Sequence, residues 1–390
     1  MSYEEINTNV GSSSSSGRKR GAWNIAVIEG DGIGPEVTTQ SVNVLKAIAE
    51  TFGHQFDFTY GLMGAIAIDK TGNPLPDETI EICLNSDAIL FGAIGHPKYD
   101  NDPAAKVRPE QGLLKLRKSL QLFANIRPVT TYESLFHLSP LKTKIIEGVD
   151  LVIYRELTGG IYFGKKETNQ EKTYAVDECA YSKAEIERIA HPAFKAAQQR
   201  RKKLTLVDKA NVLETSRLWR KVVQEIAAQY PDVAVDYLFV DNAAMQIIQQ
   251  PKQFDVILTE NMFGDIISDE ASVISGSLGL LPSASVGNGV AMFEPIHGSY
   301  PQAAGKDIAN PLGSILSAAM LLDHFELHNE ATLVREAVNW TLQNGFVTKD
   351  IDPVNFYFTS TLGELICDYV SGKIPTVRRE NIEMRKSTII

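Results

Sequence analysis

The stretch that decides the fold reads NIAVIEGDGIGPE and covers residues 24–36. It opens with a short apolar run, continues through three glycines spaced G-x-G-x-G, and ends with Pro35, which suits the first turn of a helix. Apolar residues then recur at helical spacing from Val37 to Ile48. The chain is therefore predicted to open as strand, tight turn and helix. The glycine spacing alone supports a structural turn as well as a ligand loop, and it is not the G-x-G-x-x-G dinucleotide fingerprint.

The same alternation continues along the chain. Further apolar runs have the length of buried strands, and two helical patterns separate some of them. The runs lie at 88–91, 151–154, 204–207, 237–240 and 256–258, and the helical patterns at 183–202 and 216–229. Strands alternating with helices predict an α/β protein with a largely parallel sheet. No internal repeat occurs, and no Pro/Ser-rich linker follows residue 22, so two domains would share the sheet.

Composition limits the classes of function. The 390 residues are 44% hydrophobic and 22% charged, as in soluble proteins large enough for two domains, and the net charge of -10 argues against nucleic-acid or membrane partners. We find neither a signal-peptide pattern nor an apolar stretch of the ~18 residues that a membrane helix needs. Cys83, Cys179 and Cys367 are too far apart for a disulfide framework or a CxxC site, which favours the reducing cytoplasm.

The first 22 residues differ from the rest. They contain five consecutive serines (12–16) followed by a basic triplet (18–20). We interpret residues 1–22 as a flexible tail. The alternative is that the basic triplet is a targeting or phosphate-binding patch.

Three arginines are candidates for binding a diacid. Arg117 and Arg127 lie in apolar segments, and Arg155 follows directly after an apolar strand. A guanidinium holds a carboxylate through two parallel hydrogen bonds. If the three converge, they suit a small dicarboxylate; each one alone could equally be a structural ion pair.

Three aspartates are candidates for a metal site. Asp265 and Asp269 have the i, i+4 spacing that puts both on one face of a helix, and Asp241 is predicted at the end of the strand 237–240. Oxygen ligands of this kind favour Mg²⁺ or Mn²⁺. The alternative is a solvated acidic helix face, which the apolar neighbours of Asp265 make less suitable.

Two further residues could move protons. Lys209 follows an apolar strand, at the sheet edge where α/β proteins bind ligands. Near a metal and arginines its charged form would be disfavoured, so it could act as a neutral base. Tyr162 could donate a proton, and each of the two could also be an ordinary surface or core residue. The polar loop from Glu294 to Ser299 contains His297, which is weak support for any function by itself.

Together these segments resemble the isocitrate/isopropylmalate dehydrogenase family over nearly all of the chain from Ile25 onward. The isopropylmalate branch matches best, through RPEQGLL (108–114), RELTGGIYFG (155–164) and DKANVLE (208–214). The resemblance implies oxidative decarboxylation of 3-isopropylmalate to 4-methyl-2-oxopentanoate with NAD and Mg²⁺ or Mn²⁺, a reaction of leucine biosynthesis.

The resemblance also implies roles for residues. The substrate carboxylates would be held by Arg117, Arg127 and Arg155, and the isopropyl group by Glu110, Leu113 and Leu114. The catalytic groups would be Lys209, which takes the C2 hydroxyl proton with Asp241 beside it, and Tyr162, which protonates the enol. The metal ligands would be Asp241, Asp265 and Asp269. The cofactor side would comprise Glu294, His297, Gly298, Gln302 and Asn310.

The fold implied by the resemblance has two domains that share one large mixed sheet and is unlike a Rossmann domain. The first, cofactor-side domain would comprise residues 23–122 and 276–390, and the second, for substrate, metal and dimerisation, residues 123–275. The resemblance further implies a homodimer in which Lys209 and Asp241 enter the partner's active site.

One departure from the family pattern concerns the cofactor. Most NAD-using members have an aspartate shortly after the His-Gly-Ser segment, where this chain has Gln302. The amide supplies neither that carboxylate nor a charge for a 2′-phosphate, and we expect NAD. Two alternatives stay open: a sister enzyme acting on tartrate, malate, homoisocitrate or isocitrate, and a non-catalytic relative that binds a diacid or nucleotide.

Overall fold

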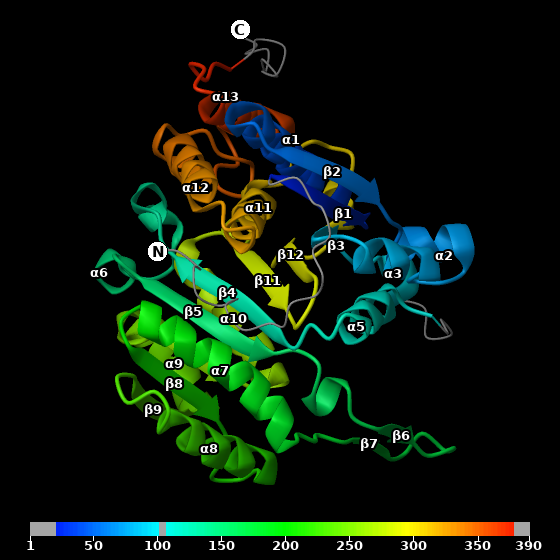
Figure 1. Ribbon diagram of the computed structural model, residues 1–390, viewed down its shortest axis with the longest axis vertical. Helices are drawn as coiled ribbons and strands as arrows, with labels where there is room; N and C mark the ends of the chain where they lie inside the picture. Colours follow the sequence, from blue (N-terminus) through cyan, green and yellow to red (C-terminus); the bar gives the residue numbers. More distant parts are fainter. Residues whose placement is uncertain (1–20, 101–106, 378–390) are drawn as a thin grey trace, which may run out of the picture.

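The computed structural model describes residues 21–100 and 107–377 (Figure 1). A ten-stranded sheet runs through these residues in the order β2-β1-β3-β12-β11-β4-β5-β10-β8-β9, and β6 and β7 form a separate hairpin. The strands are β1 (Ala22–Gly30), β2 (Gln55–Tyr60), β3 (Ala88–Ala93), β4 (Ala124–Thr130), β5 (Asp150–Glu156), β6 (Lys166–Thr168), β7 (Ala175–Asp177), β8 (Lys203–Asp208), β9 (Ala234–Phe239), β10 (Val256–Thr259), β11 (Pro282–Val286) and β12 (Ala291–Pro295).

Helices cover both faces of the sheet. They are α1 (Gly34–Phe52), α2 (Ala65–Thr71), α3 (Asp77–Leu84), α4 (Pro97–Asp100), α5 (Pro109–Ser119), α6 (Thr143–Ile146), α7 (Lys183–Gln199), α8 (Glu214–Ala227), α9 (Val240–Gln249), α10 (Asn261–Ser272), α11 (Leu312–His324), α12 (His328–Gln343) and α13 (Thr359–Val370). Short 3₁₀ turns are η1 (Glu133–Leu138), η2 (Gly160–Tyr162), η3 (Pro251–Gln253), η4 (Val273–Ser275), η5 (Leu278–Leu280) and η6 (Pro301–Ala303).

The sheet is mixed, as expected. β11 runs antiparallel to β12 and β4, and β4 runs antiparallel to β5. The other neighbouring pairs are parallel. Because β12 lies beside β3, the two ends of the chain build one half of the sheet. The boundaries predicted at 122/123 and 275/276 for the two domains stay a prediction.

The apolar runs and helical patterns correspond to β1, β3, β5, β8, β9, β10, α7 and α8. One position needs correction. Asp241 does not end a strand, because β9 ends at Phe239 and α9 begins at Val240, which puts Asp241 in the first helical turn. Phe239 is still extended, so the apolar run continues across the strand-to-helix junction, and a carboxylate is favourable at that helix terminus.

The glycine turn after β1 is structural. Gly30 has φ +72°, and a Cβ there would lie 1.9 Å from the carbonyl oxygen of Ala93 in β3. The buried Asp31 carboxylate accepts hydrogen bonds from the backbone of Ala65, Ile66 and Gly95. The turn therefore joins β1 to β3 and α2.

Alternate side chains of β5 belong to two hydrophobic cores, one on each face of the sheet. Val152 and Tyr154 belong to a core on the face covered by α7, α8, α11 and α12, whereas Leu151 and Ile153 face α9 and α10. Figure 1 shows the first group of helices in front of the sheet and α9 and α10 behind it. Since successive strand residues point to opposite faces, Arg155 faces α10.

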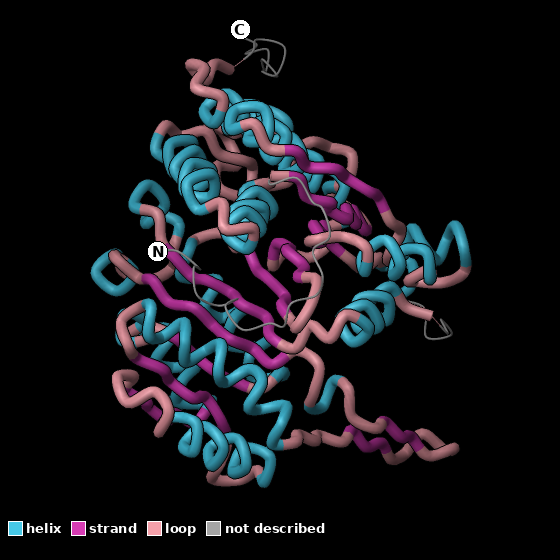
Figure 2. The backbone as a smooth tube through the Cα atoms, in the orientation of Figure 1, coloured by secondary structure: helices cyan, strands magenta, loops and turns pink. Residues whose placement is uncertain are grey.

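The hairpin β6–β7 projects away from the body of the molecule, as Figure 2 shows. Tyr174 and Val176 on it are 66% and 40% exposed. Residues 1–20 of the predicted tail lie outside the described residues, and β1 begins at Ala22. Within the described residues, no helix has the length and apolar character to cross a membrane. The three cysteines are free.

The turn predicts a difference between two glycine substitutions. Gly53 also has positive φ (+77°), but nothing lies within 4 Å of its Cβ position. Gly53→Ala should lower the free energy of unfolding by about 1–2 kcal/mol, the cost of a left-handed conformation. Gly30→Ala adds a backbone collision and should lose more than about 4 kcal/mol. Urea unfolding measures both, and equal losses would contradict this account of the turn.

Candidate active site

Three arginines converge at the face of the sheet that α10 covers. Arg127 lies in β4, Arg155 in the neighbouring β5, and Arg117 in the last turn of α5. Burial, together with the positive charges of Arg127 and Arg117, lowers the pKa of Arg155 to about 10. Burial likewise lowers the pKa of Arg127. Arg117 is linked to Arg127 by hydrogen bonds through Glu294, Ser285 and Asn125. Arg127 and Arg155 both lie against Asp265, so the three arginines share one site.

Arg127 is held on every side. Its Nε donates to Asn125 Oδ1 (2.7 Å), and its Nη1 donates to Ser268 Oγ (2.6 Å) and Asp269 Oδ1 (3.1 Å). Its Nη2 lies 3.8 Å from Asp265 Oδ1. The Arg127 side chain is 10% exposed, and its guanidinium is thus fixed between β4 and α10.

Arg155 is bound by two residues of α10. Its Nη1 forms a very short ion pair with Asp265 Oδ1. Its Nε and Nη2 both donate to Asn261 Oδ1, at 3.1 and 2.8 Å. Gly264 makes this approach possible, because a Cβ there would lie 2.7 Å from Arg155 Cγ.

Asp265 and Asp269 lie on one face of α10, as their spacing predicts. Asp265 is 34% exposed and Asp269 65%, so both carboxylates reach solvent while contacting the arginines. The described residues contain no group of three His, Cys, Asp or Glu side chains that could hold a metal. The chain therefore supplies two of the three predicted metal ligands at this place, and their oxygen donors suit a hard divalent cation.

Tyr162 lies in η2 and donates to Asp265 Oδ2 (2.8 Å). Burial, together with the hydrogen bond to Asp265, raises the pKa of its hydroxyl to about 12. The Arg155 guanidinium lies 5.8 Å from the ring centre. Tyr162 is thus a proton donor at neutral pH, next to the arginines and carboxylates.

Lys209 and Asp241 form a separate pair. Lys209 Nζ lies 2.5 Å from Asp241 Oδ1, and this hydrogen bond lowers the pKa of Asp241. Lys209 follows β8, two strands from β5, which corresponds to about 10 Å along the sheet at ordinary strand spacing. Within one chain, this pair thus lies away from the three arginines.

The residues predicted for the isopropyl group lie on α5. Glu110, Leu113, Leu114 and Arg117 are spaced i, i+3, i+4 and i+7, which puts them on one helix face. Arg117 Nη2 donates to Glu294 Oε1 (3.0 Å), at the end of β12. Glu294 therefore lies at the arginine cluster, although the resemblance assigns it to the cofactor side.

A pocket of about 440 Å³ is lined by His297, Gly298 and Asn310. Burial lowers the pKa of His297. The carboxylate of Asp350 accepts from Asn310 Nδ2 (3.1 Å) and also lines the pocket. Gln302 is an exposed residue of η6, next in the chain to this loop.

Sequence reasoning missed the residues that position the cluster. Asn261 is fully buried, and its Nδ2 donates to Gly159 O (3.0 Å) in the segment that leads to Tyr162. Tyr181 donates to Glu260 (2.9 Å), which caps α10 through Phe263 N. The only signal was position: Asn261 lies four residues before Asp265, on the same helix face.

Comparison with known proteins agrees with this arrangement. The model of the isocitrate/isopropylmalate dehydrogenase family matches residues 24–366. The 3-isopropylmalate dehydrogenase of Bacteroides fragilis (strain YCH46) is 55% identical over 350 residues, covering 89% of this chain and 99% of the relative. That of Priestia megaterium (strain DSM 319 / IMG 1521) is 56% identical over 338 residues, covering 85% and 91%.

A solved structure agrees as well. The crystal structure of isocitrate dehydrogenase from Methylococcus capsulatus superposes with a TM-score of 0.82 at 35% identity, covering 90% of this chain and 99% of that one. The fold is that of a decarboxylating dehydrogenase. The chain belongs to the isocitrate/isopropylmalate dehydrogenase family.

The position of Asn261 predicts a graded effect of two substitutions. Asn261→Ala leaves Arg155 and Gly159 O without their partners and should lower the free energy of unfolding by about 3 kcal/mol. Asn261→Asp keeps an acceptor for Arg155 and loses only the donor to Gly159, so it should lose about 1 kcal/mol. Chemical denaturation measures both. If the aspartate variant is as unstable as the alanine variant, the oxygen of Asn261 does not hold Arg155.

Proposed function

We propose that this protein oxidises and decarboxylates 3-isopropylmalate to 4-methyl-2-oxopentanoate, with NAD as the acceptor, as a step of leucine biosynthesis in the cytoplasm. The observation that carries the proposal is the convergence of the buried Arg127 and Arg155 with Arg117, which shares a helix face with Leu113 and Leu114. The curated relatives that cover most of the chain carry the name of this activity.

The arginines suit a dicarboxylate. Arg117, Arg127 and Arg155 come from three elements and point to one site, where their charges repel one another. An added dianion relieves this repulsion and accepts hydrogen bonds from the guanidinium groups. Arginine is the residue that binds carboxylates with a fixed geometry.

The face of α5 favours isopropylmalate over isocitrate. Leu113 and Leu114 are half-buried and share that face with Arg117. An apolar branch on the substrate would cover the two leucine side chains and remove their surface from water. A third carboxylate at that place would lose its hydration without gaining a new partner. Isocitrate and the other sister diacids are therefore weaker substrates in this proposal.

A divalent cation, Mg²⁺ or Mn²⁺, fits Asp265 and Asp269, with the partner subunit's Asp241 as the third ligand. When bound, it supplies Lewis-acid polarisation of the substrate's oxygen atoms. Asp265 and Asp269 also remain close to Arg155 and Arg127, so the cation and the dianion neutralise each other in one site.

The chain's own residues move the protons. A bound nicotinamide would accept the C2 hydrogen with its electron pair, and Lys209 would be the base that accepts the hydroxyl proton. Lys209 is paired with Asp241 here, and a cation held by Asp241 would weaken that pairing. After CO₂ leaves, Tyr162 gives its proton to C3 of the enol; its pKa of about 12 keeps that proton in place at neutral pH.

The dinucleotide would occupy the pocket formed by His297, Gly298 and Asn310. Lys349 and Asp350 both line it, so its cationic and anionic side chains balance. A 2′-phosphate would find no excess positive charge there, and Gln302 is neutral. This favours NAD over NADP.

A second copy of the chain completes the site in this proposal. Met245 on α9 and Ile266 on α10 are 54% and 58% exposed; Met245 lies one helical turn after Asp241, and Ile266 follows Asp265 in the chain. Large exposed apolar side chains of this kind indicate a protein interface. A dimer related by twofold symmetry would bring Lys209 and Asp241 of each subunit to the arginines of the other.

An assay of the purified protein tests the function. With Mg²⁺ or Mn²⁺ present, reduction of NAD should be fastest with 3-isopropylmalate and slow with isocitrate or malate. With 3-isopropylmalate as substrate, NADP should be reduced more slowly than NAD. Tyr162→Phe should lower the rate of product formation at least about 100-fold, the usual contribution of a general acid. A preference for another diacid would contradict the assignment of Leu113 and Leu114. No turnover of any diacid would favour the non-catalytic alternative.

Mixing two inactive variants tests the shared site. Lys209→Met and Asp265→Asn should each abolish activity. If Lys209 acts across the interface, exchange of subunits creates hybrid dimers with one intact site, and about one quarter of the wild-type activity should return. If Lys209 acts within its own chain, every site of the mixture carries a substitution and no activity returns.

A further inference from the structure

A second pocket lies on the other face of the strands that carry the arginines. Its volume is about 570 Å³, within the range of about 300–1,000 Å³ typical of small-molecule sites. Pro128, Thr130 and Tyr154 line it, while their chain neighbours Arg127 and Arg155 point to the opposite face. Figure 1 shows α7, α11 and α12, which also line it, on the near side of the sheet. We name it the rear pocket, because it lies behind β4 and β5 as seen from the arginines.

The rear pocket has an apolar floor and a polar mouth. Leu316 and Met320 of α11 and Val152 of β5 line it and are 4–5% exposed. The polar lining residues Thr332 and Asn339 on α12 reach solvent. A ligand that fits this gradient has an apolar body directed inward and a polar group at the mouth.

The mouth offers guanidinium donors to an anion. The lining contains two arginines, Arg200 and Arg335, and one carboxylate, Asp150, and each arginine already pairs with a carboxylate. Arg200 donates through Nε to Asp255 and through Nη2 to Asp150, and Arg335 donates through Nη2 to Asp323. Each guanidinium has five N–H donors, so both keep donors for a ligand.

A phenol adds a further donor. Tyr132 lines the rear pocket, and burial raises the pKa of its hydroxyl to about 12. Arg335 lines the same pocket, and its positive charge lowers the pKa of that hydroxyl. A protonated phenol and a guanidinium at one place can both donate to a carboxylate.

We propose that the rear pocket binds a small monocarboxylate with a branched apolar body, its carboxylate held by Arg335 and Tyr132. The apolar body lies on Leu316 and Met320. The size and the apolar floor of the pocket support this class of ligand over inorganic phosphate, which has no apolar part. The remaining guanidinium donors support it over a neutral alcohol, which has no charge.

The position of the rear pocket couples it to the active site. Its occupant contacts β4 and β5 from behind and spans α7 and α12, which belong to the two halves of the sheet. An occupant that bridges α7 and α12 would favour the arrangement of β4 and β5 that presents Arg127 and Arg155 together to a diacid. Tighter diacid binding, by about fivefold, is expected when the rear pocket is filled. This consequence rests on the proposed function, whereas the binding site itself does not.

Calorimetric titration of the full chain with 4-methylpentanoate tests the site, with 4-methylpentanol and inorganic phosphate as comparison probes. Asn339→Trp fills the rear pocket from α12. Gln343→Trp, one turn further along the same helix and outside the pocket, is the matched control. The carboxylate should bind once per chain to the wild type and to Gln343→Trp, and at least about tenfold more weakly to Asn339→Trp, a loss of about 1.4 kcal/mol.

The outcomes separate cleanly. No binding to the wild type, equal binding to Asn339→Trp, or equal binding of the alcohol or phosphate would overturn the proposed site. If the carboxylate binds as expected but the dissociation constant of 3-isopropylmalate is unchanged in its presence, the coupling is overturned and the site stands. Because this titration needs no turnover, its failure differs from a failure of the dehydrogenase assay.

Discussion

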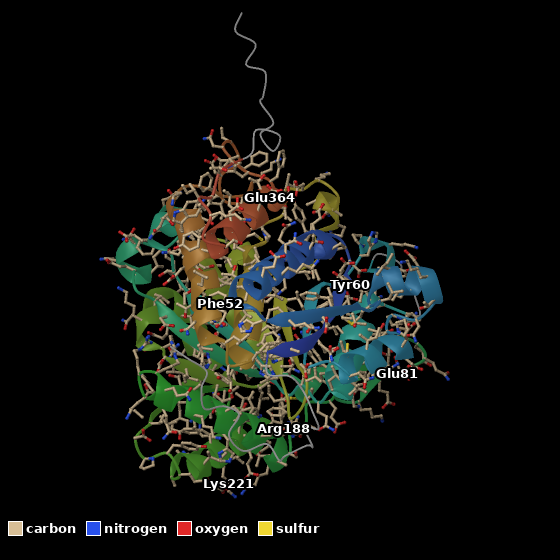
Figure 3. All side chains as sticks on the ribbon, turned by 45° about the horizontal axis from the view of Figure 1, so that its top comes forward. Phe52, Tyr60, Glu81, Arg188, Lys221 and Glu364 are labelled. Atoms are coloured by element: carbon tan, nitrogen blue, oxygen red, sulfur yellow. The ribbon has the colours of Figure 1, made fainter. Side chains whose placement is uncertain are left out.

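Two buried guanidinium groups constrain the rest of this structure. Arg127 and Arg155 are 8% and 3% exposed, and a buried charge is costly unless it is paired and hydrogen-bonded. Asp265, Asp269 and Asn261 supply those partners, and all three come from α10. The antiparallel pairing of β4 with β5 sets the arginines on adjacent strands, and α10 must lie over them for the sheet to remain stable. A neighbouring helix also forms an ion pair with β5. Arg188 of α7, labelled in Figure 3, pairs with Glu156, the residue directly after Arg155.

The same pairing explains how a stable fold can also bind ligands. The aspartates that neutralise the arginines are 34% and 65% exposed, so a dicarboxylate can reach the guanidinium groups from solvent. In the proposed function the substrate's carboxylates take over that neutralisation, and the aspartates turn to a cation. The total charge of the site changes little, because one dianion and one dication enter together. The hydrogen bond from Tyr162 to Asp265 would keep the proposed proton donor in the same site.

Local patterns predicted much of the fold and part of the site. The strands with continuous apolar runs, such as β3 and β10, were predicted because both of their faces are buried. β4 and β11 were missed because Asn125, Arg127 and two prolines interrupt their apolar character. Asp265 and Asp269 were predicted as a pair because a helix fixes their spacing. Asn261 and Tyr181 could not be predicted, since their importance comes from contacts between segments about 100 residues apart. The separation of Lys209 from the arginines likewise depends on strand order.

The most direct test of the account is a crystal structure with 3-isopropylmalate and Mn²⁺, in which anomalous scattering locates the metal. The account predicts substrate carboxylates on Arg117, Arg127 and Arg155, with the metal held by Asp265, Asp269 and the partner subunit's Asp241. Arg155 should exchange part of its contact with Asp265 for the substrate. A diacid bound elsewhere, with the contacts of Arg127 and Arg155 unchanged, would contradict the claim that these arginines and aspartates exchange partners.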